Sequence, residues 1–238
     1  MTLRARIQWL FLGDPPAYPP DPVDRRTIDL AGLAIPALAT LALLVVTVVL
    51  LLDRSHDLLP RFGPVHPESL RNQAIERFVA FGLLPLGILV ALREDPRRYG
   101  LGVGDRRRGI LLLGLLTVIS VPAIVVIARL PEIRYWYAPS MTTVADVALT
   151  NLLDLVPAEF LLRGFLLFAL VRVIGPAGVL VAIVPFVFSH IGKPDLETLS
   201  TIGGGFVFGW LAWRTGSVWY GGLYHVVIQT AVIVAAAA

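Results

Sequence analysis

The sequence predicts an all-α membrane protein, a polytopic helical bundle of about seven spans. Of its 238 residues, 56% are hydrophobic and only 16% are charged, whereas a soluble domain carries about 25% charged residues. The mean hydropathy is +0.77, and apolar runs of about 20 residues, the length of a transmembrane helix, recur along the chain. Because backbone groups in hydrocarbon must bond within their own segment, we expect these runs to be helices.

Each expected span is an apolar segment bounded by polar or basic residues. The segments cover residues 30–52, 78–92 with a start near Ile75, 110–128, 143–174, 178–191, 196–213 and 218–235. The fourth segment is too long for one simple crossing, so we expect it to tilt or to divide near Pro157 into two helices.

The chain is predicted to be one domain with three parts. Residues 1–26 are polar and proline-rich, and we expect them to form an irregular cytoplasmic arm. Residues 27–142 hold the N-terminal transmembrane helices and their loops, among them the polar loop 129–142, whose aromatic residues suit the headgroup level. Residues 143–238 form the membrane core that carries the motifs described below.

Basic residues between the spans predict the orientation, because cytoplasmic loops carry the excess of Lys and Arg. With the N-terminus inside, the cytoplasmic segments hold twelve basic residues and the opposite side holds seven, while Arg163 lies within a span. The twelve are Arg4, Arg6, Arg25, Arg26, Arg93, Arg97, Arg98, Arg106, Arg107, Arg108, Arg172 and Arg214. The seven are Arg54, Arg61, Arg71, Arg77, Arg129, Arg134 and Lys193. We therefore expect an integral protein of the plasma membrane with a cytoplasmic N-terminus.

Composition also excludes several kinds of site. The chain has no cysteine, which excludes disulfides, thiolate metal sites and cysteine catalysis. The formal net charge of +3 comes from arginines that lie mostly between apolar runs, where they set topology. We therefore expect the lipid bilayer as a partner and no nucleic acid.

Ionisable residues inside apolar segments are the candidate functional residues. Glu159 and Arg163 share one segment, His190 lies in the next, and His225 lies in the last. A charged group at the centre of a membrane helix costs at least about 2.5–3.5 kcal/mol, so it usually has a partner or a function. Glu159 and Arg163 are four residues apart and could touch as a structural ion pair. A structural pair and a polar site are both open interpretations at this point.

The sequence around this pair, residues 157–165 (PAEFLLRGF), resembles the Glu-Glu-x-x-x-Arg motif of the CPBP family, the CAAX-prenyl-endopeptidase and bacteriocin-processing membrane proteins. Residues 186–190 resemble that family's Phe-x-x-x-His element, and residues 203–213 resemble its Gly-rich helix. Residues 215–219, which lead to His225, resemble the stretch before its last His-x-x-x-Asn element. The resemblance covers about residues 143–235 and implies the family's four-helix core.

The resemblance implies a set of site residues and shows two departures. The residues that match the second Glu, the Arg and the two His of the family are Glu159, Arg163, His190 and His225. The first Glu, which the family associates with activating water, is Ala158 here, and the final Asn is Gln229. The implied catalytic residues are Glu159, His190, His225 and Gln229.

Two other acids could replace the missing first Glu. Asp154 is four residues before Ala158 and faces the same side of a regular helix. Glu197 lies just beyond His190, at the start of the next expected helix. The plainer interpretation of Asp154 is an interfacial or helix-start acid, and that of Glu197 is a first-turn acid favoured by the helix dipole. Lys193 is expected to extend to the membrane interface.

The usual designation of the family as metalloproteases implies a Zn²⁺ site formed by His190, His225 and Glu159. Two imidazoles and a carboxylate can hold zinc with one open position, although the sequence has no His-Glu-x-x-His motif. Alternatively, the imidazoles act without a metal, one positioning water and the other stabilising an oxyanion.

The resemblance thus implies an intramembrane endopeptidase with a hydrophobic, membrane-associated or prenylated peptide substrate and a site open to the membrane or the cytoplasmic side. Water activated by Glu159 and a histidine would attack the peptide bond. Ser189 is not expected to be a nucleophile, because it and His190 would point about 100° apart on a helix. The alternative is a non-catalytic relative, a membrane binding, chaperone or immunity protein, which Ala158 favours. A transporter is disfavoured because the chain shows no internal repeat.

Overall fold

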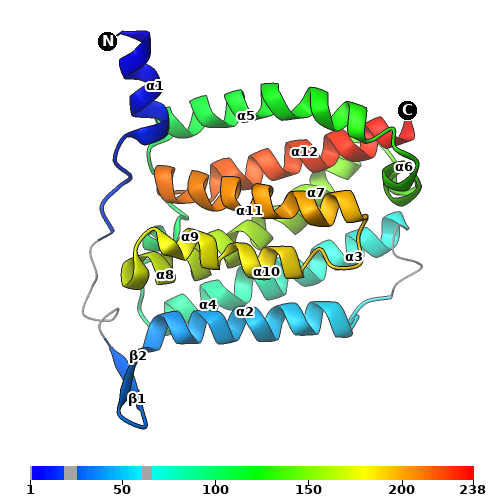
Figure 1. Ribbon diagram of the computed structural model, residues 1–238. Coiled ribbons are helices and arrows are strands. Elements are labelled where there is room, and N and C mark those ends of the chain that lie inside the picture. Colours follow the sequence, from blue (N-terminus) through cyan, green and yellow to red (C-terminus); the bar gives the residue numbers. More distant parts are fainter. Residues whose placement is uncertain (1, 19–25, 61–65) are drawn as a thin grey trace.

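A computed structural model describes residues 2–18, 26–60 and 66–238 and consists of long helices that run side by side in alternating directions (Figure 1). The bundle helices are α2 (Ala37–Ser55), α3 (Pro67–Arg77), the π-helix η1 (Phe78–Leu83), α4 (Leu84–Ala91), α5 (Arg106–Ile127), α7 (Val144–Glu159), the π-helix η4 (Phe160–Leu166), α8 (Leu167–Ile174), α9 (Ala177–Val181), α10 (Ile183–Phe188), α11 (Asp195–Thr215) and α12 (Trp219–Ala237). The all-α prediction is therefore confirmed.

Shorter elements lie at the two ends of the bundle. They are α1 (Leu3–Leu12), the antiparallel hairpin β1 (Thr27–Leu30) and β2 (Leu33–Pro36), the 3₁₀-helices η2 (Pro96–Tyr99) and η3 (Ala138–Ser140), and α6 (Pro131–Tyr137). The prediction of an irregular arm is wrong for α1, where the Thr2 hydroxyl caps the helix by accepting from the backbone N–H of Ala5. The rest of that arm, residues 19–25, and residues 61–65, which hold Arg25 and Arg61 of the orientation count, lie outside the described residues, as does residue 1.

Two of the predicted spans differ in detail from the observed helices. Residues 144–174 do not divide, because α7, η4 and α8 follow one another without a break. Pro157 lacks the N–H of a regular helix bond, and the chain passes into the wider π register three residues later. Residues 178–191 do divide, into α9 and α10 on either side of Ala182, before a turn that contains His190.

Length and apolar composition qualify four of the described helical segments to cross a membrane. They are α2, residues 67–91, α5 and α12, and α9–α10 is a shorter apolar segment. The α7–α8 helix carries Asp154, Glu159 and Arg163 within its apolar stretch. These charges explain why a helix at the centre of the bundle does not look like a simple span.

The central element is the η4–α8 segment, since every residue from Phe160 to Arg172 is buried. Leu161, Phe165 and Leu166 are fully inaccessible and join the main hydrophobic cluster with residues of α2, α10 and α11. Glu159 and Arg163 therefore lie at the heart of the molecule.

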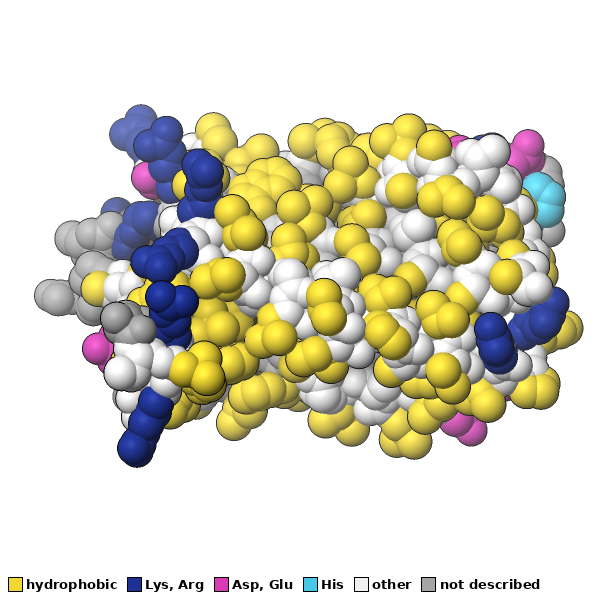
Figure 2. Space-filling view, turned by 90° about the horizontal axis from the view of Figure 1, so that it is seen from above, with side chains coloured by type: hydrophobic (Ala, Val, Ile, Leu, Met, Phe, Trp, Pro, Cys, Tyr) yellow, Lys and Arg dark blue, Asp and Glu magenta, His cyan; other side chains and the backbone are white. Residues whose placement is uncertain are grey.

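The outer faces of the bundle are apolar, and one end is basic. Figure 2 shows a hydrophobic surface between the two ends, with Lys and Arg gathered at the left. On α5, for example, Val118, Ile119 and Val126 are all exposed. A contiguous exposed apolar surface of this size is expected where lipid covers the protein. We call the end where α2 begins and where α4, α8 and α11 finish the basic end.

A glycine allows α5 and α12 to pack closely. A Cβ added at Gly109 would overlap the ring of Tyr220 on α12, whereas a Cβ at Gly114, on the same helix, would meet open space. Overpacking of this kind costs typically about 1–3 kcal/mol, so Gly109→Ala should lower the thermal unfolding midpoint in detergent. Gly114→Ala is the matched control and should leave the midpoint unchanged or raise it. Equal midpoints for the two variants would show that the α5–α12 contact is not tight.

Candidate functional site

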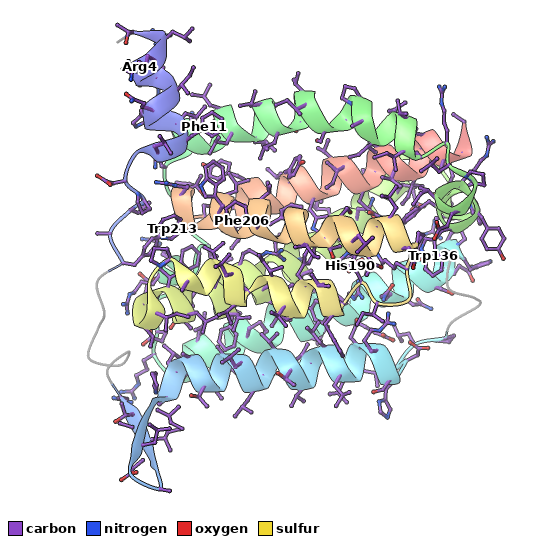
Figure 3. The ribbon with its side chains drawn as sticks, in the orientation of Figure 1. Arg4, Phe11, Trp136, His190, Phe206 and Trp213 are labelled. Atoms are coloured by element: carbon purple, nitrogen blue, oxygen red, sulfur yellow. The ribbon has the colours of Figure 1, made fainter. Side chains whose placement is uncertain are left out.

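A cavity of about 580 Å³ enters the bundle at the end opposite the basic end. Its inner wall includes Ala158, Leu162 and His225, and His190 lines it from the turn after α10. Exposed residues at its rim include Arg54 and Asp57, near the end of α2. In Figure 3, His190 lies toward the end that carries Trp136, whereas Trp213 lies toward the basic end.

Glu159 and Arg163 form a buried pair behind the cavity wall. One carboxylate oxygen, Oε1 of Glu159, lies 3.4 Å from Arg163 Nη1 and 3.0 Å from His225 Nδ1. Both charged side chains are only 1% exposed. His225 lines the cavity, whereas Glu159 is not among its lining residues in the described part of the chain. The carboxylate thus reaches the cavity only through the imidazole of His225.

The guanidinium of Arg163 lies between two aromatic rings. Its Cζ is 4.1 Å from the ring centroid of Phe186 and 5.3 Å from that of Phe208. Its three nitrogens have no hydrogen-bond partner among the described residues. A desolvated cation over a ring face gains about 2 kcal/mol or more. Glu159 and these two rings therefore replace the hydration of a fully buried charge.

The surroundings of His190 fix which of its ring nitrogens carries the proton. Nδ1 lies 2.8 Å from the backbone oxygen of Phe186, and a carbonyl oxygen can only accept. In the neutral ring, Nδ1 is therefore the donor and Nε2 the acceptor. Ser189 donates its hydroxyl to the same carbonyl over 2.7 Å. This bond occupies the Ser189 hydrogen and gives no support to a serine nucleophile.

His225 has the same arrangement with a different partner. Its Nδ1 donates to the Glu159 carboxylate, so Nε2 is the acceptor nitrogen of the neutral ring. The ring of Phe208 stacks on it at 4.6 Å, and Phe186 touches the imidazoles of His190 and His225 at centroid distances of 4.6 and 5.9 Å. The structure thus brings both histidines to one cavity, where each contacts the Phe186 ring.

Asp154 lies in the same cavity, one helical turn before Ala158. Its carboxylate accepts from Arg77 Nη1 at 3.1 and 3.4 Å, and Arg77 also donates two bonds of 2.8 Å to Asp53. One arginine therefore serves two carboxylates, which leaves this cluster with one net negative charge. The Asp154 carboxylate is therefore close to the position of the missing Glu, but it is bound by Arg77.

Glu197 lies apart from this cluster. It accepts from the Tyr137 hydroxyl at 2.7 and 2.6 Å and from Lys193 Nζ at 2.9 Å, and it does not line the cavity within the described residues. Lys193 thus forms an ion pair rather than only reaching the interface. Burial raises the pKa of Tyr137 to about 12, so its hydroxyl stays protonated and available as a donor. Gln229 lines the cavity and contacts the same hydroxyl.

Sequence reasoning missed the roles of Asp53 and Arg77. From the sequence, Arg77 is expected only to be a loop cation that sets topology, and no role is predicted for Asp53. The available signal was their position at the ends of two consecutive apolar segments, which places them at the same end of an antiparallel pair of helices.

The described residues do not gather into a metal site. No group of three or more His, Cys, Asp or Glu side chains among them is arranged to hold an ion. Glu159 contacts the Nδ1 face of His225, so it is not placed to share an ion with the Nε2 atoms of the two histidines. The zinc site stays a prediction from resemblance, and no step below depends on a metal.

One comparison with known proteins gives a match. The family model for type II CAAX prenyl endopeptidase Rce1-like proteins matches residues 140–231, from η3 to the second half of α12. No curated protein and no solved structure matches the chain. The matched segment contains Ala158, Glu159, His190, His225 and Gln229. The resemblance drawn from the motifs is therefore confirmed at the level of the family.

Replacing Arg163 should strand a carboxylate in the core. We expect Arg163→Ala to lower the free energy of unfolding in detergent by about 3–5 kcal/mol, since breaking a buried pair leaves an uncompensated charge. The double variant Glu159→Gln/Arg163→Met, which removes both charges, should lose less. If Arg163→Ala is as stable as the wild type, or less damaging than the double variant, the two residues do not stabilise each other.

Proposed function

Residues 140–231 form an Rce1-like region, consistent with a protease of the CPBP family, and from this premise we propose that the chain is an intramembrane endopeptidase. It hydrolyses a peptide bond in a membrane-associated or lipidated polypeptide. The observation that carries the proposal is the 3.0 Å contact between Glu159 and His225, at a cavity that His190 also lines.

His225 is the proposed general base. Its Nε2 accepts a proton from a water in the cavity while the water oxygen attacks the carbonyl carbon of the substrate. The Glu159 carboxylate, on Nδ1, holds the ring in the required tautomer and stabilises the imidazolium that forms. When the tetrahedral intermediate collapses, the C–N bond breaks and the same proton passes to the leaving amine. No covalent enzyme intermediate is needed.

His190 and Gln229 are the proposed positioning groups. The acceptor Nε2 of His190 orients the attacking water, because its Nδ1–H is held by the backbone oxygen of Phe186. The side-chain amide of Gln229 can donate to the oxyanion of the tetrahedral intermediate, and it belongs to the same cavity. Asp154 is the proposed carboxylate in place of the first family Glu, where it can accept a hydrogen bond from the attacking water, since it lines the cavity one turn from Ala158.

Loss of the proposed base, or of the carboxylate that orients it, should strongly reduce cleavage. General acid–base groups contribute typically 10²–10⁴-fold, so His225→Ala and Glu159→Gln should reduce kcat/KM by about that factor. The assay uses membrane-tethered and prenylated peptides with purified protein in lipid, in the presence of Zn²⁺ and in the presence of a chelator. His56→Ala, an exposed histidine outside the cavity, is the matched control. Unchanged turnover by folded His225→Ala would refute the proposed base.

Variants at Ala158 and at the two acids distinguish which carboxylate takes part. If the family Glu is simply missing, Ala158→Glu should raise cleavage by about 10²–10⁴-fold. If Asp154 has taken its place, Asp154→Asn should abolish turnover by a folded protein, whereas Glu197→Gln, outside the cavity, should not. If instead Glu197→Gln abolishes turnover and Asp154→Asn does not, Glu197 is the carboxylate that takes part.

A second function is favoured by one observation, the methyl group of Ala158 at the cavity wall where the family has its first Glu. A non-catalytic relative would retain the pocket as a binding site for a hydrophobic polypeptide. Absence of cleavage by the wild type and by Ala158→Glu, across the full peptide panel and with or without Zn²⁺, would favour this function over proteolysis.

A further inference from the structure

The two ends of the bundle differ strongly in basic residues. The basic end holds eleven of those that the structure describes, in α1, beside the hairpin, in the connection 92–105, in the first turn of α5, and near the ends of α8 and α11. The opposite end holds six, and Figure 2 shows the contrast. The connections at the basic end are short, which is where Lys and Arg act most strongly on orientation. The basic end is therefore the end expected in the cytoplasm.

The cavity belongs to the other end. Its exposed rim, at Arg54, Asp57 and Gly192, lies where α2 ends and where the chain turns from α10 into α11. Trp136 and Tyr137 also line it, and they lie on α6 between α5 and α7. Aromatic residues of this kind mark the headgroup level. The mouth of the cavity is thus at the membrane surface opposite the basic end.

The basic end itself is closed toward the site. Between it and Glu159 lie the residues Phe160 to Arg172, all buried. Tyr99 of η2 and Val218 pack against this segment and are also inaccessible. A polypeptide segment arriving from the basic end would have to displace this packed core to reach His225.

From the charge of one end and the opening at the other, we infer that the site is entered from the non-cytoplasmic side of the membrane. The cavity takes a segment of a membrane-anchored polypeptide that is present on the non-cytoplasmic side. The rim carries Arg54, Asp57 and Lys193, charges of both signs, which suits a peptide better than a strongly charged ligand. The identity of the substrate rests on the proposed function, whereas the side of entry does not.

The absence of cysteine from the chain makes the side of entry directly measurable. Single-cysteine variants of the full chain are treated with a membrane-impermeant maleimide in intact cells and in inside-out vesicles. Leu58→Cys and Tyr135→Cys report the cavity end, and Val103→Cys reports the basic end, since all three side chains are exposed in or beside connections. Thr150→Cys, in the cavity wall, reports the cavity itself.

We expect labelling of Leu58→Cys, Tyr135→Cys and Thr150→Cys in intact cells and loss of that labelling in sealed inside-out vesicles. Val103→Cys should show the reverse. The reverse pattern for the whole set, or labelling of Thr150→Cys only from the side of Val103→Cys, overturns the inference. Labelling of Leu58→Cys and Val103→Cys from one side also overturns it, because the bundle would then not cross the membrane.

A second measurement separates this inference from the proposed activity. A membrane-impermeant peptide that the detergent-solubilised protein cleaves is added to intact cells and to inside-out vesicles. Cleavage only in intact cells supports entry from the non-cytoplasmic side, and cleavage only in inside-out vesicles overturns it while leaving the protease intact. If no peptide is cleaved in detergent, the proposed function fails, and the cysteine labelling alone decides the side of entry.

Discussion

The structure depends on one buried cation. Arg163 lies in the segment from Phe160 to Arg172, every residue of which is buried, and its charge must be balanced without water. Glu159 supplies the opposite charge one turn away, and the faces of Phe186 and Phe208 cover the planar guanidinium. Three elements, α7–η4, α10 and α11, therefore contact the Arg163 side chain. The same Glu159 oxygen also contacts His225. One atom thus balances the charge of Arg163 and orients the imidazole of His225.

The surroundings of this pair explain why the site is polar but sheltered. The carboxylate has no direct place in the cavity, and its effect is carried by His225. A second set of charges, Asp53, Arg77 and Asp154, lies nearer the mouth and keeps a carboxylate close to Ala158. The cavity is therefore bounded by one balanced pair, Glu159 and Arg163, and by one cluster in which a single arginine holds two carboxylates. Each group would be costly in hydrocarbon without its partners.

The sequence predicted the features that follow from local periodicity. Apolar runs predicted the helices, and the spacing of Glu159 and Arg163 predicted their contact, because residues four apart lie on one face of a helix. The π-helix was not predictable from Pro157 alone, since a proline can also end a helix. Helix α1 was not predicted, because the apolar residues in it are too few to mark a helix within a polar, proline-rich segment. The pairing of Arg77 with Asp53 depends on how two helices dock, which no local pattern contains.

Phe186 has a consequence for how this protein can change over evolution. Its ring covers Arg163 and touches both imidazoles, while its backbone oxygen holds the proton of His190. One phenyl group thus sets the spacing between the two histidines and shields the charge behind them. A smaller side chain at this position would alter proton transfer, ring spacing and core electrostatics at the same time. We therefore expect substitutions in the pocket to be tolerated only where they leave this ring in place.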